Sequence, residues 1–188
     1  MATARAVEAL KDLQEVGGDN VLTLPLDVTD PEQVVAAATE AEARFGGIDV
    51  LFNNAGIGYF AAVEESDEAE IRRMMEINVF GLAAVTNAVF AGHACPPLGS
   101  HPQRLLRRRG AVVPGRGWYN ASKFAVEGLS EALAQEVAPL GIKVVLVEPS
   151  GFATDWAGNS AAEVTPEAEI ADYAPTAGTQ RAGSALRR

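Results

Sequence analysis

The sequence predicts an α/β fold in which a mostly parallel sheet is covered by helices on both faces. Segments with helical periodicity alternate along the chain with short, continuous apolar segments. Strands that are buried on both faces of a parallel sheet have this unbroken apolar character. Polar or glycine-containing turns follow the apolar segments, as expected at the sheet edge where α/β proteins bind ligands. The length of 188 residues favours one domain.

Each expected element follows from periodicity and from residues that start or stop helices. The elements are, in order, a helix over 5–15, a strand over 21–28, a helix over 31–45, a strand over 48–52, a helix over 66–90, a helix over 118–138 and a strand over 143–148. Pro25 indicates an edge position for its strand. Asp30 and Pro31 are an N-cap and a first helical residue, and Gly46 ends that helix. Ser66 is expected to cap the helix that it precedes.

Composition and charge exclude several classes of protein. The chain has 15 Lys and Arg against 25 Asp and Glu, a net charge of −10, which argues against binding to nucleic acid or to an anionic membrane surface. Cys95 is the only cysteine, so a disulfide framework is excluded. No apolar run approaches the ~20 residues of a membrane span. The charged, helix-like N-terminus is unlike a signal peptide. We therefore expect a cytoplasmic protein.

Residues 91–117 differ from the rest of the chain. They contain five of the basic residues, four of the prolines and no acidic residue. Three interpretations stay open: a basic loop for an anionic partner, a solvated insertion, or foreign sequence such as a frameshift leaves, which we favour. His93, Cys95 and His101 lie here, but their spacing fits no standard zinc site, so no metal is expected.

Tyr119 and Lys123 carry the strongest chemical signal. They are four residues apart on an expected helix, so their side chains share one face. A tyrosine has an ordinary pKa of ~10. A neighbouring ammonium favours the phenolate and lowers that pKa, so the pair can act as an acid/base near neutral pH. Two amphipathic residues on a surface helix would give the same pattern, so the pair needs support from elsewhere in the chain.

That support comes from four further segments in a characteristic order. The segments are LDVTD (26–30), NNAG (53–56), IN (77–78) and VEPSGFATDW (147–156), which accompany YNASK (119–123). With these motifs the chain resembles the short-chain dehydrogenase/reductase family over residues 1–92 and 117–156. The resemblance implies a doubly wound, Rossmann-like sheet that binds NAD or NADP. It also implies hydride transfer between the nicotinamide and a small-molecule alcohol or carbonyl compound.

The resemblance assigns roles residue by residue. Tyr119 would be the catalytic acid/base, Lys123 would lower its pKa and hold the nicotinamide ribose, and Asn78 would support a water in the proton relay. The remaining expected cofactor contacts are Arg5, Asp27, Asn54, Ala55, Gly56, Pro149, Phe152 and Thr154. Ser150 stands where the family usually has glycine. Arg5 follows the end of a strand, where an arginine often meets the 2′-phosphate of NADP, so NADP is weakly favoured over NAD.

The chain also departs from the family pattern. The first strand and its glycine-rich phosphate turn are absent from the 188 residues, so the fold is expected to be truncated. No serine lies between Ser100 and Tyr119, where the family has its catalytic serine. Only 111–113 is expected to replace the fifth strand, which would leave the strand at 48–52 without partners. Unpaired buried amides cost about 1–3 kcal/mol each, so we expect a poorly soluble or partly folded chain.

Two functions therefore stay open. The first is an NAD(P)-dependent oxidoreductase, impaired in this chain, with residues 1–156 as a partial Rossmann domain and 157–188 as a loop or disordered tail. The second is a non-catalytic fragment or frameshifted product that keeps only association through the helices at 66–90 and 118–138, which in the family build the dimer interface. The residues that would select a substrate follow no recognisable pattern.

Overall fold

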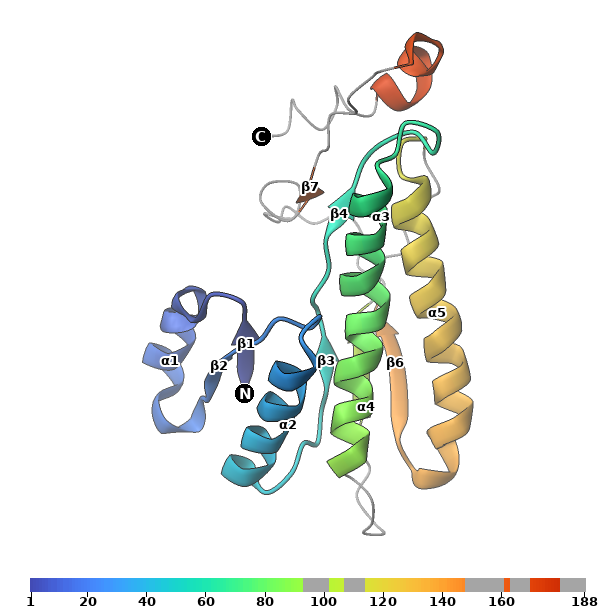
Figure 1. Ribbon diagram of the computed structural model, residues 1–188. Helices are drawn as coiled ribbons and strands as arrows, with labels where there is room; N and C mark the ends of the chain where they lie inside the picture. Colours follow the sequence, from blue (N-terminus) through green and yellow to red (C-terminus); the bar gives the residue numbers. More distant parts are fainter. Residues whose placement is uncertain (93–101, 107–113, 148–160, 163–169, 180–188) are drawn as a thin grey trace.

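The computed structural model describes residues 1–92, 102–106, 114–147, 161–162 and 170–179 (Figure 1). The strands are β1 (Ala2–Ala4), β2 (Thr23–Pro25), β3 (Phe52–Asn53), β4 (Gly58–Tyr59), β5 (Pro102–Leu106), β6 (Lys143–Val147) and β7 (Ala161–Ala162). The α-helices are α1 (Lys11–Gly17), α2 (Pro31–Phe45), α3 (Glu68–Met75), α4 (Leu82–Gly92) and α5 (Gly117–Val137). Short 3₁₀ segments are η1 (Val7–Leu10), η2 (Gly18–Asn20), η4 (Ala138–Leu140) and η6 (Ala171–Tyr173). Two π-helical segments are η3 (Glu76–Gly81) and η7 (Ala174–Gly178).

All strand pairs among the described residues are parallel, which confirms the predicted α/β class. β1 pairs with β2, β5 lies between β3 and β6, and β4 pairs with β7. Helix α2 packs against α4, and α5 packs against both η3 and β6. Figure 1 shows the carboxyl ends of β3 and β6 and the N-terminal ends of α3 and α5 directed toward the same end of the molecule.

Helix α2 forms as its terminal residues predict. The Asp30 carboxylate accepts hydrogen bonds from the backbone N–H groups of Glu32 and Gln33, and Gly46 closes the helix with a φ of +80°. The buried residues of the helix are Val34, Ala37, Ala38 and Ala41. Their spacing of three and four residues places them on one face, which is the face expected to bury itself against a neighbouring helix.

The N-cap of the helix expected over 66–90 lies one residue later than predicted, and the helix is interrupted. Asp67, and not Ser66, is the N-cap, because its carboxylate accepts from the Glu70 N–H at 2.9 Å. The Ser66 hydroxyl instead donates to the Ala62 carbonyl at 2.8 Å. The π-helical η3 joins α3 to α4, an irregularity that the sequence analysis did not predict.

One helix in the described part of the chain resembles a membrane span by length and composition alone, although the sequence was expected to contain no apolar run of ~20 residues. The continuous helix Glu68–Ala91 is long and apolar enough to pass that test. The composition of a buried helix explains the result, since this helix packs against α2 and α5 and buries Met74, Asn78, Val79 and Gly81. We therefore interpret it as a core helix of the domain.

Several strand predictions need correction. The strand expected over 48–52 is confined to Phe52–Asn53, and that over 21–28 to Thr23–Pro25. β5 occupies 102–106, whereas the strand predicted at 111–113 falls outside the described residues. The prediction that β3 has no partner was therefore wrong, because Phe52 and Asn53 are in register with Arg104 and Leu105. Pro102 is tolerated as the first residue of β5, a position where a missing N–H does least harm.

The two ends of the described chain also differ from a simple helix and tail. The helix expected over 5–15 is a 3₁₀ turn followed by α1, and its Leu13 is exposed. Within the segment expected to be a loop or tail, 157–188, the structure has β7 and the two turns η6 and η7. The boundary at residue 156 stays a prediction.

Candidate active site

The candidate site lies between two helices and one loop. Helix α5 carries Tyr119, Ser122 and Lys123, and η3 carries Asn78. The loop that follows β3 carries Asn54, Ala55 and Gly56, at the carboxyl edge of the parallel sheet. The packing of α5 against η3 brings together residues that are more than 40 positions apart in the sequence.

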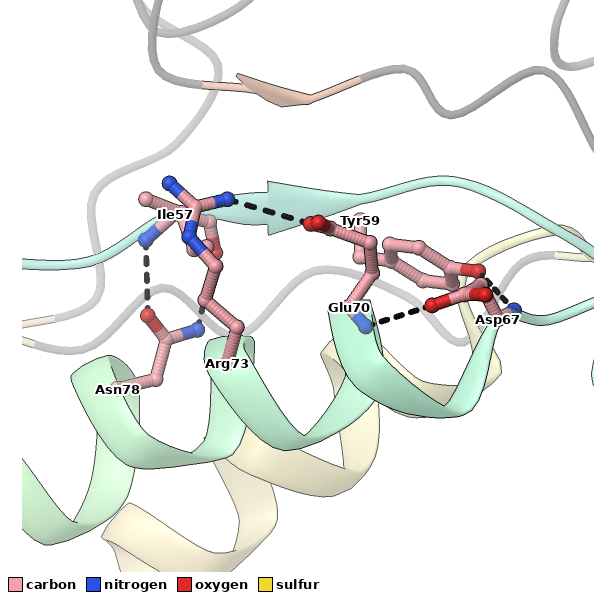
Figure 2. Close-up of polar contacts among 6 residues, drawn as sticks. All are labelled: Ile57, Tyr59, Asp67, Glu70, Arg73 and Asn78. Carbon is pink, nitrogen blue, oxygen red and sulfur yellow. Dashed lines mark hydrogen bonds and ion pairs between the residues drawn. The ribbon is translucent and has the colours of Figure 1, made fainter.

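Asn78 joins the helix to the loop. Its side chain is 1% exposed, and its amide makes a two-way bridge with the backbone of Ile57: Oδ1 accepts from the N–H at 2.8 Å, and Nδ2 donates to the carbonyl at 2.9 Å (Figure 2). This burial shows that Asn78 is not a solvent-exposed residue on the outside of the helix. The π-helical segment places an otherwise poor helix former at the point where the helix meets the loop.

Ser122 links Asn78 to the tyrosine segment, a role that was not predicted from the sequence. Its fully buried hydroxyl accepts from Asn78 Nδ2 at 3.2 Å and donates to the Tyr119 carbonyl at 2.7 Å. A serine one residue before the lysine, on the buried side of an amphipathic helix, was the available signal. The contact orients α5 against η3 at the level of the tyrosine.

Gly56 approaches the other side of the same group of residues. A Cβ atom built on Gly56 would lie 3.2 Å from Asn78 Oδ1 and 3.5 Å from Lys123 Nζ. The first distance is closer than an ordinary van der Waals contact. A side chain at this position would require the Asn78 amide to shift by a few tenths of an ångström, so the loop backbone is packed closely against Asn78 here.

Lys123 and Tyr119 lie as their spacing predicts. Lys123 Nζ is 5.4 Å from the centroid of the Tyr119 ring, and the same Nζ lies beside Gly56. Burial lowers the pKa of Lys123, because a desolvated ammonium is less stable than a solvated one. Lys123 therefore lies beside the loop 54–56, with its amine over the Tyr119 ring.

Tyr119 is set in an apolar environment. The residue is 6% exposed and packs with Tyr59, Ala61 and Met74. Three partly buried apolar residues pack against this cluster: Ile57, Ile71 and Trp118. The Lys123 amine lies near this phenol, and the Ser122 hydroxyl donates to the Tyr119 carbonyl. A phenol in such surroundings can exchange a proton with a bound molecule.

Arg5 and Asp27 follow the adjacent strands β1 and β2. The Asp27 carboxylate accepts from both the N–H and the hydroxyl of Thr29, at 2.9 and 2.7 Å. These hydrogen bonds, with a smaller contribution from the positive charges of Arg5 and Arg73, hold the pKa of Asp27 below its ordinary value. Asp27 thus shapes its own turn, while Arg5 is exposed.

The remaining predicted residues divide into two groups. Asn54 and Ala55 are exposed at the end of β3, and Asn53 beside them donates to the Thr86 hydroxyl at 3.1 Å. Pro149, Ser150, Phe152 and Thr154 lie outside the described residues, as do the histidines and the cysteine of the segment 91–117. Within the described part of the chain, no group of three His, Cys, Asp or Glu side chains could hold a metal ion.

The chain matches a family model described as Enoyl-(Acyl carrier protein) reductase over residues 1–183. It is 41% identical to Oxidoreductase BOA17 of Botryotinia fuckeliana over 168 residues, which is 85% of this chain and 59% of that relative. A crystal structure of a short-chain dehydrogenase from Streptomyces avermitilis superposes with a TM-score of 0.83 at 39% identity, covering 95% of this chain and 65% of that one.

A second solved structure adds a bound nucleotide. The 3-ketoacyl-(acyl-carrier-protein) reductase from Brucella melitensis complexed with NADH has a TM-score of 0.68 and 30% identity, covering 78% of this chain and 63% of that one. The chain thus spans less than two thirds of the length of each of these relatives.

Proposed function

Because this chain belongs to the short-chain dehydrogenase/reductase family, we propose that it is an NAD(P)-dependent oxidoreductase. It transfers a hydride between a nicotinamide and a small-molecule alcohol or carbonyl compound. The observation that carries the proposal is the convergence of Lys123, Asn78 and Gly56, with Tyr119 on the same helix as Lys123. We place the protein in the cytoplasm.

Tyr119 acts as the acid/base. In reduction it donates its phenolic proton to the oxygen that gains negative charge, and in oxidation it removes the proton from the alcohol. A positively charged Lys123 stabilises the phenolate form, and its lowered pKa means that burial opposes that charge in the isolated chain. A ligand hydroxyl that accepts a hydrogen bond from Nζ offsets this desolvation.

Asn78 has a structural role and a proposed catalytic one. Its side-chain amide is occupied with Ile57 and Ser122, so the amide holds the loop and α5 in register. The proposed support for a water in the proton relay then falls to the backbone of this π-helical segment, where the regular carbonyl-to-amide pattern of an α-helix is altered.

The loop that follows β3 fits a dinucleotide. Asn54 and Ala55 are exposed, and the backbone at Gly56 lies close to Asn78 and to Lys123 Nζ. A bound nicotinamide supplies the hydride donor or acceptor. Asn54, Ala55 and Gly56 line that cofactor, Lys123 donates to its ribose, and Pro149, Phe152 and Thr154 are proposed for the nicotinamide end.

The adenosine end favours NADP in this proposal. Arg5 is exposed at the carboxyl end of β1 and lies close enough to Asp27 to lower its pKa. A guanidinium at this edge matches a 2′-phosphate, since arginine recognises phosphate through a planar pair of donors. Asp27 would contact the adenine. NAD remains the second choice, and Arg5→Glu would shift the preference toward it.

The lack of a serine between Ser100 and Tyr119 implies impaired turnover. A second hydroxyl next to the tyrosine would share the stabilisation of the substrate oxygen, and one missing donor of this kind costs about 10²–10³ in rate. We therefore propose slow turnover in this chain, together with cofactor binding. A reaction at ordinary family rates would contradict the impairment.

A second candidate function is association without catalysis. Phe80 on η3 is 58% exposed, and Phe124 and Leu129 on α5 are 50% and 46% exposed. Large apolar side chains exposed along packed helices favour a protein interface. We propose that η3 and α5 form the interface of a homo-oligomer, since they lie within the two segments, 66–90 and 118–138, that the family resemblance assigns to a dimer interface. A monomer at all accessible concentrations would contradict this.

The decisive experiment measures cofactor binding and turnover separately. The 188-residue chain is titrated with NADPH and NADH while the nucleotide fluorescence is followed, beside Tyr119→Phe and Lys123→Met. We expect Tyr119→Phe to bind as the parent does and to lose turnover with a carbonyl panel, whereas Lys123→Met loses affinity. Lys143→Met, at an exposed lysine of β6, is the matched control for the loss of a positive charge. Absence of binding by either nucleotide at millimolar concentration would refute the oxidoreductase proposal and leave the second candidate.

A further inference from the structure

Two adjacent carboxylates, Glu64 and Glu65, attach a distant part of the chain to the candidate site. Glu65 Oε1 accepts from the backbone N–H of Ile170 at 2.8 Å, and Glu64 Oε2 accepts from the Tyr173 hydroxyl at 2.6 Å. These contacts span more than 100 residues of sequence. We call residues 170–179 the strap. Figure 1 shows the strap beyond the N-terminal ends of α3 and α5.

The Glu65 carboxylate accepts hydrogen bonds from two separate segments of the chain, one through each oxygen. Its second oxygen, Oε2, accepts from the Ala62 N–H at 3.4 Å, while Oε1 holds Ile170. Ala62 is buried, and its carbonyl accepts from the Glu65 N–H and the Ser66 hydroxyl, at 3.2 and 2.8 Å. The carboxylate is thus a bridge between the turn that precedes α3 and the first residue of the strap.

The strap also contacts the segment that begins α5. Ala177 is buried, and a Cβ on Gly115 would lie 3.5 Å from the Ala177 Cα. Gly115 has a φ of +75°, a conformation that favours glycine, and lies four residues before Tyr119. The next residue, Arg116, bridges to Ala61. The strap therefore touches both turns from which α3 and α5 start.

An independent strand contact supports the attachment. β7 pairs in parallel with β4, with Gly58 opposite Ala161 and Tyr59 opposite Ala162. Tyr59 packs with Tyr119 in the buried cluster, and its hydroxyl accepts from the Asp67 N–H at 2.7 Å (Figure 2). The segment containing β7 and the strap thus meets the turn region of the site at two separate places.

We infer that Glu65 is a positioning residue for Tyr119. By fixing the strap to the turn before α3, its carboxylate holds Ala177 against Gly115 and so sets the start of α5. The role in catalysis rests on the proposed function, whereas the mechanical link does not. Glu64 and Tyr173 form a second, more exposed attachment of the same strap.

The test compares Glu65→Ala, Glu65→Gln and Tyr173→Phe by amide hydrogen exchange. Glu65→Ala is expected to speed exchange about 10-fold or more at Ile170 and also at Asn120, whose N–H donates to the Arg116 carbonyl at 2.8 Å. Glu65→Gln keeps one acceptor oxygen and is expected to restore most of the protection. Tyr173→Phe tests the strap if Glu65→Ala does not fold. Glu68→Ala, next to the strap contacts but without one, is the matched control.

Two outcomes would overturn the inference. Faster exchange confined to 170–179, with Asn120 unchanged in Glu65→Ala, would show that the carboxylate holds only the strap. Equal loss of protection in Glu68→Ala would show a general effect of charge. If turnover is detectable, Glu65→Ala should lower kcat and raise the substrate KM with unchanged NADPH affinity. If the unsubstituted chain does not bind NADPH, the proposed function is refuted, but hydrogen exchange still tests whether Glu65 links the strap to the start of α5.

Discussion

The bridge between Asn78 and Ile57 makes Asn78→Ala the most informative substitution. The change removes three hydrogen bonds of a side chain that is 1% exposed, at 2.8, 2.9 and 3.2 Å. It leaves the N–H and the carbonyl of Ile57 without their partners. Each unsatisfied buried group costs about 1–3 kcal/mol. Since Ile57 is only partly buried and water can reach it, we expect the lower half of that range, about 2–4 kcal/mol in total.

Urea unfolding followed by far-UV circular dichroism measures this loss. A loss of that size corresponds to a fall in Tm of about 5–15 °C for a chain of this length. The same helix supplies a matched control, Asn87→Ala, at an exposed position, where we expect a change within about 0.5 kcal/mol. Equal stabilities for the two variants, at unchanged dependence on urea, would refute the bridging role of Asn78. A variant with normal stability but lost nucleotide binding would assign Asn78 to the ligand alone.

Three further substitutions test the helices and the titrating groups. Gly128→Ala, at an exposed position of α5 where a Cβ meets no atom within 4 Å, should stabilise the chain by about 0.5–1 kcal/mol in urea unfolding; destabilisation would mean that α5 is covered there. Burial lowers the pKa of Lys123, so the unfolded state binds more protons and wild-type stability rises with pH up to about 10.5. Lys123→Met removes this buried charge, so it should be more stable than the wild type at neutral pH. The difference in unfolding free energy should shrink as the pH approaches 10.5, and Lys143→Met is the control for the loss of a positive charge. The hydrogen bond to Glu64, with the charges of Glu64, Glu65 and Asp172, raises the pKa of Tyr173. The hydrogen bond between Tyr173 and Glu64 therefore stabilises the folded state fully below pH 10, and this contribution is lost as the pH rises through the raised pKa. Absorbance at 295 nm should show one phenol that ionises at higher pH than an ordinary tyrosine, and Tyr173→Phe should remove this signal.

The parts of the fold that depend on local signals could be predicted from the sequence. Asp30, Pro31 and Gly46 fix the ends of α2, because capping and glycine conformation act within a few residues. The four-residue spacing of Tyr119 and Lys123 is likewise a local property of a helix. The start of α3 shows that local signals do not always decide which residue caps a helix. Ser66 and Asp67 are both good caps, and the choice depends on the contact of Ser66 with Ala62.

The parts that depend on distant contacts could not be predicted. β5 has an arginine-containing, proline-led sequence that favours a loop, and it forms a strand because β3 and β6 offer edges on both sides. The role of Ser122 depends on a residue 44 positions away, and that of Glu65 on one 105 positions away. No periodicity within a single segment carries such information, since long-range pairing is decided by the packing of the whole chain.

The π-helical segment between α3 and α4 has a consequence for the direction in which the two halves of this helix face. Successive residues of an α-helix are rotated by about 100° around its axis, and a π-helical turn holds more residues than an α-helical one. If the same residues, Glu76–Gly81, were wound as a regular α-helix, the upstream half would be turned relative to the downstream half by roughly the rotation of one residue. Met74, which is now fully buried, would then move off the buried face of the helix. The π-helical segment therefore keeps the apolar faces of α3 and α4 directed toward the same buried core.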